Sequence, residues 1–66
     1  MKEITPDRYR CLMGECPSTF KLDDGRIVII GKKAEPSILS EISGRIGRDE
    51  DVIVVEAGLL ETVFSK

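Results

Sequence analysis

The chain has 66 residues, which is enough for one small domain. Hydrophobic residues make up 41% of the chain and charged residues 33%, a balance that excludes a disordered tail. The formal net charge of −2 argues against nucleic-acid binding driven by overall positive charge. We therefore expect a single domain over residues 1–66, in which residues 1–7 form a flexible lead.

No apolar run approaches the ~20 residues that span a bilayer, and residues 1–7 lack the apolar core of a secretory signal. We therefore expect a cytoplasmic protein without membrane contact, in which Cys11 and Cys16 are reduced thiols. The free energy of unfolding of a domain of this size is only ~3–5 kcal/mol unless a disulfide or a bound metal cross-links the chain. Self-association would also stabilise it, because it buries more apolar surface.

The first strand is expected at residues 8–13, where a period of two places Arg8 and Arg10 on one face. Gly14-Glu15 then fits a type II′ turn, which takes glycine at its first central position. Residues 16–22 are the expected returning strand, with Pro17 near its start, where proline is tolerated.

Asp24-Gly25 stands between two strand-like runs and is the strongest hairpin signal in the chain, because both residue types tolerate the positive φ angles of a type I′ turn. A two-residue turn would place Asp23 opposite Arg26 as an exposed ion pair. It would also give one apolar face and leave a second pair of apolar residues on the other face. The first face would consist of Phe20, Leu22, Ile27 and Ile29, and the second would carry Val28 and Ile30.

Residues 35–47 are predicted to form a helix, with Pro36 in the first helical position. Its apolar side chains recur at helical spacing and make one stripe, formed by Ile38, Leu39, Ile42 and Ile46.

The β-branched run at residues 52–55 predicts a strand with two covered faces. Residues 57–64 predict a short terminal helix with an apolar face formed by Leu59, Leu60, Val63 and Phe64.

These elements predict an α+β domain of the order β-β-β-α-β-α. We expect a three- to four-stranded, mainly antiparallel sheet with β-hairpins, one crossover helix and a short C-terminal helix. If residues 52–55 pair in parallel with residues 26–30, the helix between them makes a right-handed crossover. The remaining sheet face needs cover from the terminal helix, from a second copy, or from both. The predicted interaction surface is therefore Val28, Ile30, Leu59, Leu60, Val63 and Phe64.

Cys11 and Cys16 are the one pair of side chains in the sequence that could bind a metal or carry out redox chemistry, and three interpretations of the pair stay open. They can pack as two semi-buried thiols. They can supply half of a zinc site, which a second chain or carboxylates such as Glu15 would have to complete, because the chain has no His. They can form a redox pair or disulfide, although the usual redox motif has two intervening residues and this one has four. In the predicted hairpin their α-carbons are ~7–8 Å apart, at or beyond the limit for an unstrained disulfide.

No other motif points to a cofactor or to catalysis. Arg8, Arg10, Lys32 and Lys33 could converge on a phosphate or an acidic partner, or they could simply protect a solvated sheet edge. Without His the commonest general base is missing, and Asp23-Asp24 are turn residues first. We expect a protein that is not an enzyme.

One stretch, Cys16-Pro17-Ser18-Thr19-Phe20 followed by residues 24–32, resembles certain short uncharacterised bacterial proteins of under ~100 residues. Some of these are encoded beside helix-turn-helix regulators. The shared features are a Cys-Pro step, a hairpin, a Gly-Lys strand end, an acidic loop and an apolar strand. The resemblance implies a regulatory or interaction role, and no catalytic residue follows from it.

The leading hypothesis is a non-enzymatic protein–protein interaction or regulatory module that forms a homodimer. The competing hypothesis is a metal-binding or redox protein that uses Cys11 and Cys16. A nucleic-acid partner is not expected.

Overall fold

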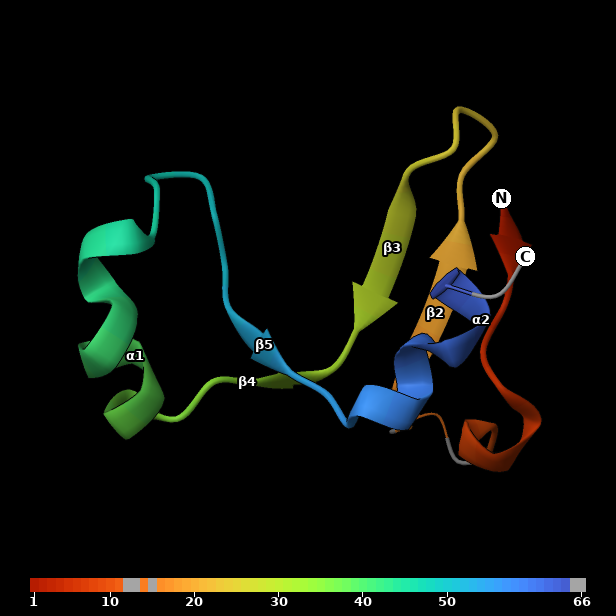
Figure 1. The fold of residues 1–66 in the computed structure, drawn as a ribbon, viewed down its shortest axis with the longest axis horizontal. Helices are drawn as coiled ribbons and strands as arrows, with labels where there is room; N and C mark the ends of the chain where they lie inside the picture. The colour runs from red at the N-terminus through yellow and green to blue at the C-terminus, as the bar shows by residue number, and fades with distance from the viewer. Residues whose placement is uncertain (12–13, 15, 65–66) are drawn as a thin grey trace.

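The computed structural model describes residues 1–11, 14 and 16–64, which form an α+β fold with two antiparallel sheets (Figure 1). The larger sheet has the strand order β1-β2-β3 and consists of β1 (Lys2–Glu3), β2 (Ser18–Lys21) and β3 (Ile27–Ile30). The smaller sheet pairs β4 (Lys32–Lys33) with β5 (Ile53–Val54). The helices are α1 (Pro36–Ile42) and α2 (Glu61–Phe64), with 3₁₀ turns η1 (Asp7–Tyr9), η2 (Ser43–Arg45) and η3 (Ala57–Leu60).

The central hairpin forms, but its loop has three residues instead of two. The N–H of Leu22 donates to the carbonyl of Arg26 at 2.8 Å, and the N–H of Gly25 donates to the carbonyl of Leu22 at 3.0 Å. Gly25 has a φ of 95°, whereas no described residue other than glycine has a positive φ. A type I′ turn needs positive φ at both central positions, so the prediction of a two-residue turn at Asp24-Gly25 is wrong. The connection is a tight turn closed by a left-handed glycine.

The extra loop residue shifts the strand register by one position. Phe20 lies opposite Val28, and Thr19 lies opposite Ile29. Because side chains alternate between faces, this slip moves the apolar residues of β3 to the other side from the one predicted. The predicted face of Phe20, Leu22, Ile27 and Ile29 is therefore wrong. Phe20 shares its face with Ser18, Val28 and Ile30, which we call the open face.

The same shift changes the predicted ion pair of the hairpin loop. Arg26 Nε lies 2.8 Å from the carboxylate of Asp24, and the N–H of Arg26 donates to that same carboxylate at 3.1 Å. The pair predicted between Asp23 and Arg26 is wrong, because these residues are no longer opposite each other across a two-residue turn.

The N-terminal segment also differs from expectation. Residues 2–3 form β1, which pairs with β2, so they are not a free lead. The strand predicted from Arg8 is replaced by η1, because Pro6 has a φ of −58° and its carbonyl accepts the N–H of Tyr9 at 2.9 Å. The predicted turn at Gly14-Glu15 and the end of the predicted strand at residues 12–13 involve positions outside the described residues.

The segment from β4 to β5 projects from the larger sheet in Figure 1, and we call residues 32–55 the arm. Lys33 lies opposite Ile53 in an antiparallel pair, so β5 does not join β3 in parallel and α1 is not a crossover helix. Pro36 occupies the first turn of α1, as predicted. The helix ends at Ile42 instead of residue 47, and a 3₁₀ turn follows.

The core of the described residues is small. Leu59 of η3 and Thr19 of β2 are completely buried, and η3 contacts β2. In Figure 1, η3 and α2 lie over one face of the larger sheet, which confirms a short helical C-terminal segment. The open face is less well covered, since Ile30 is 53% exposed. In the described part of the chain, no helix is long and apolar enough to cross a membrane.

Candidate functional site

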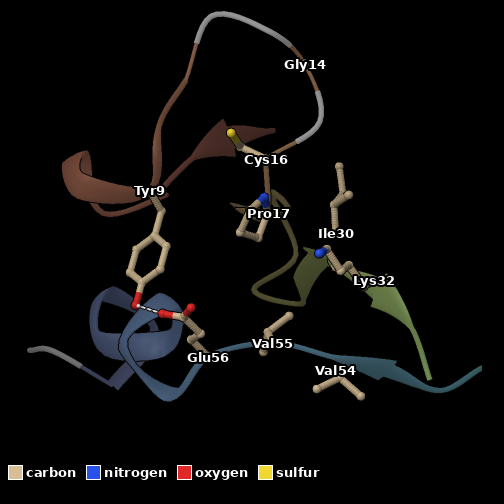
Figure 2. A pocket seen from close by; sticks show the side chains of 10 residues that line it. Tyr9, Gly14, Cys16, Pro17, Ile30, Lys32, Val54, Val55 and Glu56 are labelled. Carbon is tan, nitrogen blue, oxygen red and sulfur yellow. Dashed lines mark hydrogen bonds between the residues drawn. The ribbon is translucent and has the colours of Figure 1, made fainter. Parts of the chain in front are cut away.

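A groove of about 630 Å³ lies where the larger sheet meets the arm (Figure 2). Its apolar lining comes from four separate segments of the chain. These segments contribute Tyr9, Pro17, Ile30, Val54 and Val55. Lys32 and Glu56 add one positive and one negative group. The groove therefore combines an apolar lining with two opposite charges.

Tyr9 is held in the groove wall by polar contacts to the C-terminal segment. Its hydroxyl donates a hydrogen bond to the Glu56 carboxylate at 3.0 Å. The Arg8 guanidinium lies 5.1 Å from the centre of the Tyr9 ring, a cation–π distance. It also makes two hydrogen bonds to the Glu61 carboxylate, at 3.0 and 3.1 Å. The hydrogen bond to Glu61, with a smaller contribution from Tyr9, raises the pKa of Arg8 above its ordinary value.

Gly58 permits this close approach of η1 to η3. A β-carbon at position 58 would lie 2.5 Å from both Arg8 Nη2 and the Tyr9 hydroxyl oxygen. Both atoms are the ends of long side chains, so a larger residue at position 58 would force these two side chains to shift, whereas glycine admits them as they stand. Residues 8 and 61 are 53 positions apart, and nothing in the local sequence pattern around either one indicates the contact.

Cys11 and Cys16 are joined as a disulfide, with their α-carbons 6.1 Å apart. The expectation of two reduced thiols at ~7–8 Å is not what the structure shows, and Arg8 and Tyr9, at the start of the strand on which that distance depended, lie in η1 instead. The 6.1 Å separation lies inside the usual range for a disulfide. Figure 2 shows Cys16 beside the groove, next to Pro17.

The thiolates needed for the zinc hypothesis are absent in this bonded form, since a metal-ligating cysteine is a thiolate. Over residues 1–11, 14 and 16–64, no three His, Cys, Asp or Glu side chains gather in a metal-binding arrangement. Glu15, the carboxylate named as a further ligand, lies outside the described residues.

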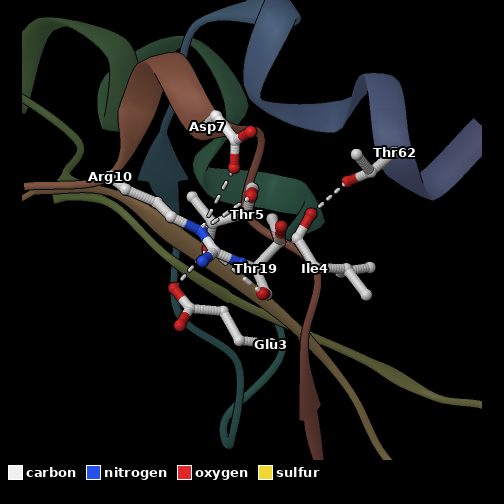
Figure 3. Close-up of polar contacts among 7 residues, drawn as sticks. All are labelled: Glu3, Ile4, Thr5, Asp7, Arg10, Thr19 and Thr62. Atoms are coloured by element: carbon white, nitrogen blue, oxygen red, sulfur yellow. Dashed lines mark hydrogen bonds and ion pairs between the residues drawn. The ribbon is translucent and has the colours of Figure 1, made fainter.

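A second polar cluster ties β1 to β2 (Figure 3). The buried hydroxyl of Thr5 accepts a hydrogen bond from the N–H of Thr19 at 3.0 Å and lies 2.8 Å from the Glu3 carboxylate. The hydroxyl of Thr62 donates to the carbonyl of Ile4, which connects α2 to the same edge. The Thr19 hydroxyl is buried and has no hydrogen-bond partner among residues 1–11, 14 and 16–64. This cluster is structural in character, because its other polar groups bond to one another.

The four basic residues considered from the sequence do not form one patch on a shared strand. Arg8 pairs with Glu61, and Arg10 lies 3.8 Å from the Asp7 carboxylate while it donates to the carbonyl of Thr5. Lys32 and Lys33 are both exposed on β4, and Lys32 lines the groove.

The residues of the predicted interaction surface lie in different environments. Leu59 is buried in the chain's own core, and Leu60 and Val63 are half-buried near it. Val28 is half-buried on the open face. Ile30 and Phe64 are exposed, at 53% and 76%.

Comparison with family models, with characterised protein sequences and with solved structures gives no match to this chain.

Proposed function

We propose that this protein is a non-enzymatic, cytoplasmic interaction or regulatory module that acts as a homodimer. The observation that carries the proposal is the surface area of the isolated chain, which is 5741 Å². A compact monomer of 7.3 kDa would expose about 4,200 Å². The excess of about 1,500 Å² exceeds the ~800 Å² that each partner buries in a standard interface. A second copy is the simplest partner that would cover it.

The shape of the chain supports the same proposal. Its radius of gyration is 13.3 Å, whereas about 11 Å is expected for a compact domain of this length. The difference comes from the arm, in which α1 has no buried residue. The apolar side chains Ile38, Leu39 and Ile42 are only half-buried. An arm with so little packing on its own chain favours contact with another chain.

The charges favour a protein partner over a nucleic acid. The net charge is −2, and the described side chains of Arg8 and Arg10 are both next to carboxylates. A phosphate backbone would have to compete with those carboxylates.

Light scattering coupled to size exclusion, with sedimentation equilibrium from about 1 to 100 µM, tests the homodimer. We expect twice the mass of the chain at the upper end of that range and dissociation on dilution. A single-chain mass at every concentration would refute the proposal. A salt-dependent shift with DNA would instead indicate a nucleic-acid partner.

A second candidate function is thiol–disulfide exchange at Cys11 and Cys16, favoured by the observed bond and the exposure of Cys11. Two molecules of a small thiol such as glutathione would reduce the bond to two protein thiols and leave as their own disulfide. Thiol titration across a glutathione redox series tests this exchange. A disulfide that stays oxidised in the most reducing buffer would be a purely structural cross-link and would contradict a role in exchange.

Elemental analysis of the reduced protein tests the zinc alternative.

A further inference from the structure

The outer edge of β3 is the least protected feature of the larger sheet. The strand order places β1 and β3 at the two edges, and in Figure 1 none of the described strands lies beside the outer edge of β3. β1 is only two residues long and exposes Lys2 and Glu3. β3 consists of Ile27–Ile30, with no proline or charge within it. Proteins often protect sheet edges with charges, proline or bulges, and β3 has none of these within its length.

The backbone of β3 offers two residues for a further strand. Leu22 donates to Arg26, which makes this pair a hydrogen-bonded one. Hydrogen-bonded and non-hydrogen-bonded pairs alternate along an antiparallel ladder. From the observed register, Val28 and Ile30 therefore bond to β2, whereas the N–H and C=O groups of Ile27 and Ile29 point away from it.

We propose that a second copy of this chain occupies the outer edge of β3 with its own β3, antiparallel and related by a two-fold axis at Val28. Ile27 then exchanges backbone hydrogen bonds with the partner's Ile29, and Ile29 with the partner's Ile27. This inference rests on the proposed homodimer and names its interface. Both copies use the same patch, as a closed two-fold interface requires.

The side chains fit this register on the open face. Phe20 lies beside Val28 across β2 and β3. The two-fold axis places Val28 next to Val28 of the partner subunit in a non-hydrogen-bonded pair, the closer type of cross-strand pair. A continuous apolar row then crosses both sheets from one Phe20 to the other. Part of the excess surface of the single chain is covered in this way.

Cross-linking through a cysteine on the axis tests the register. In Val28→Cys the two new thiols face each other with α-carbons about 4.5 Å apart, a separation that a disulfide can bridge. Arg26→Cys is the matched control. It places its thiols at the same edge but about 13 Å apart along the strands, which is too far. We expect mild oxidation to give mostly covalent dimer with Val28→Cys and at least tenfold less with Arg26→Cys, with the new bond located by peptide mass spectrometry.

Proline substitution tests the backbone contacts separately. Ile27→Pro removes an outward N–H at the first residue of β3, where proline is compatible with the strand, and Ile27→Val keeps that N–H. We expect the dimer dissociation constant to rise at least tenfold in Ile27→Pro and less than threefold in Ile27→Val, with unchanged circular dichroism in both. A wild-type dimer with equal cross-linking in Val28→Cys and Arg26→Cys would overturn the β3 interface and leave the homodimer standing. A monomeric wild type would overturn both.

Discussion

At the scale of single residues, two buried threonines differ in whether the side-chain hydroxyl makes a hydrogen bond, so removing the hydroxyl should change stability in opposite directions. Thr19 is completely buried, and its hydroxyl has no hydrogen-bond partner in the part of the chain that the structure describes. Thr19→Val replaces this hydroxyl by a methyl group of similar size and removes the desolvation cost. We expect the free energy of unfolding to increase by about 1 kcal/mol, measured by urea denaturation.

Thr5→Val is the matched control for Thr19→Val, because the chemical change is identical. The hydroxyl of Thr5 accepts the N–H of Thr19, so its loss leaves that buried donor without a partner. We expect Thr5→Val to lower the free energy of unfolding by about 1–3 kcal/mol. Equal effects of the two substitutions would contradict the hydrogen-bond assignment in this cluster.

Gly25 is the residue on which the geometry of the central hairpin depends. Its φ of 95° is strained for any residue with a β-carbon, although no atom lies within 4 Å of that position. We expect Gly25→Ala to destabilise the fold by about 1–2 kcal/mol through backbone strain alone. A melting temperature lower by at least about 4 °C would report this loss.

Gly44→Ala serves as the control for Gly25→Ala. Position 44 also has no atom within 4 Å of an added β-carbon, but its φ is outside the left-handed region. Alanine there reduces the freedom of the unfolded chain, so we expect no loss of stability and a gain of up to about 1 kcal/mol.

At the scale of elements, the sequence predicted what depends on local chemistry. The hairpin was recognisable from Asp24-Gly25, and the start of α1 from Pro36, because both residue types act on their own backbone. The class of fold and the short helical C-terminal segment followed from the apolar spacing.

The pairing of elements could not be obtained in the same way. The sequence around Asp24-Gly25 is compatible with either a two-residue or a three-residue loop. The choice between them decides on which face of the sheet each side chain of β3 lies relative to β2. β1 was missed because Lys2 and Glu3 show no apolar alternation, and an edge strand of two exposed residues needs none. The groove was missed because Tyr9 and Glu56 meet only through tertiary packing.

Helix α1 illustrates an element with a weak start. Glu35 occupies the N-cap position in an extended conformation and makes no capping hydrogen bond. The shorter side chain in Glu35→Asp keeps the charge and can accept the free backbone N–H groups of the first turn. We expect a gain of about 0.5–1 kcal/mol, visible as a higher melting temperature.

The control for the α1 substitution is Glu41→Asp, which makes the same change near the exposed end of the helix. Aspartate has a lower helix propensity than glutamate, so this variant should be neutral or slightly less stable. A gain in both variants would show that capping is not the cause.

At the scale of the whole molecule, the large accessible surface and the small core have one thermodynamic consequence. Only a few described side chains are fully buried, so most of the stability of a dimeric state would come from its interface. If folding and association are coupled, stability must depend on protein concentration. The unfolding enthalpy of two 66-residue chains is about 90 kcal/mol. A tenfold increase in concentration should therefore raise the melting temperature by about 5 °C.

Scanning calorimetry at about 20 and 200 µM measures this shift directly. The interface variant Ile27→Pro provides the comparison, because it is designed to weaken association without breaking the β2–β3 ladder. We expect its melting temperature to be lower than that of the wild type. We also expect it to change less with concentration over the same range. A wild-type melting temperature that is the same at both concentrations would show that the open face and the arm are stable without a partner, and the excess surface would then belong to a folded monomer.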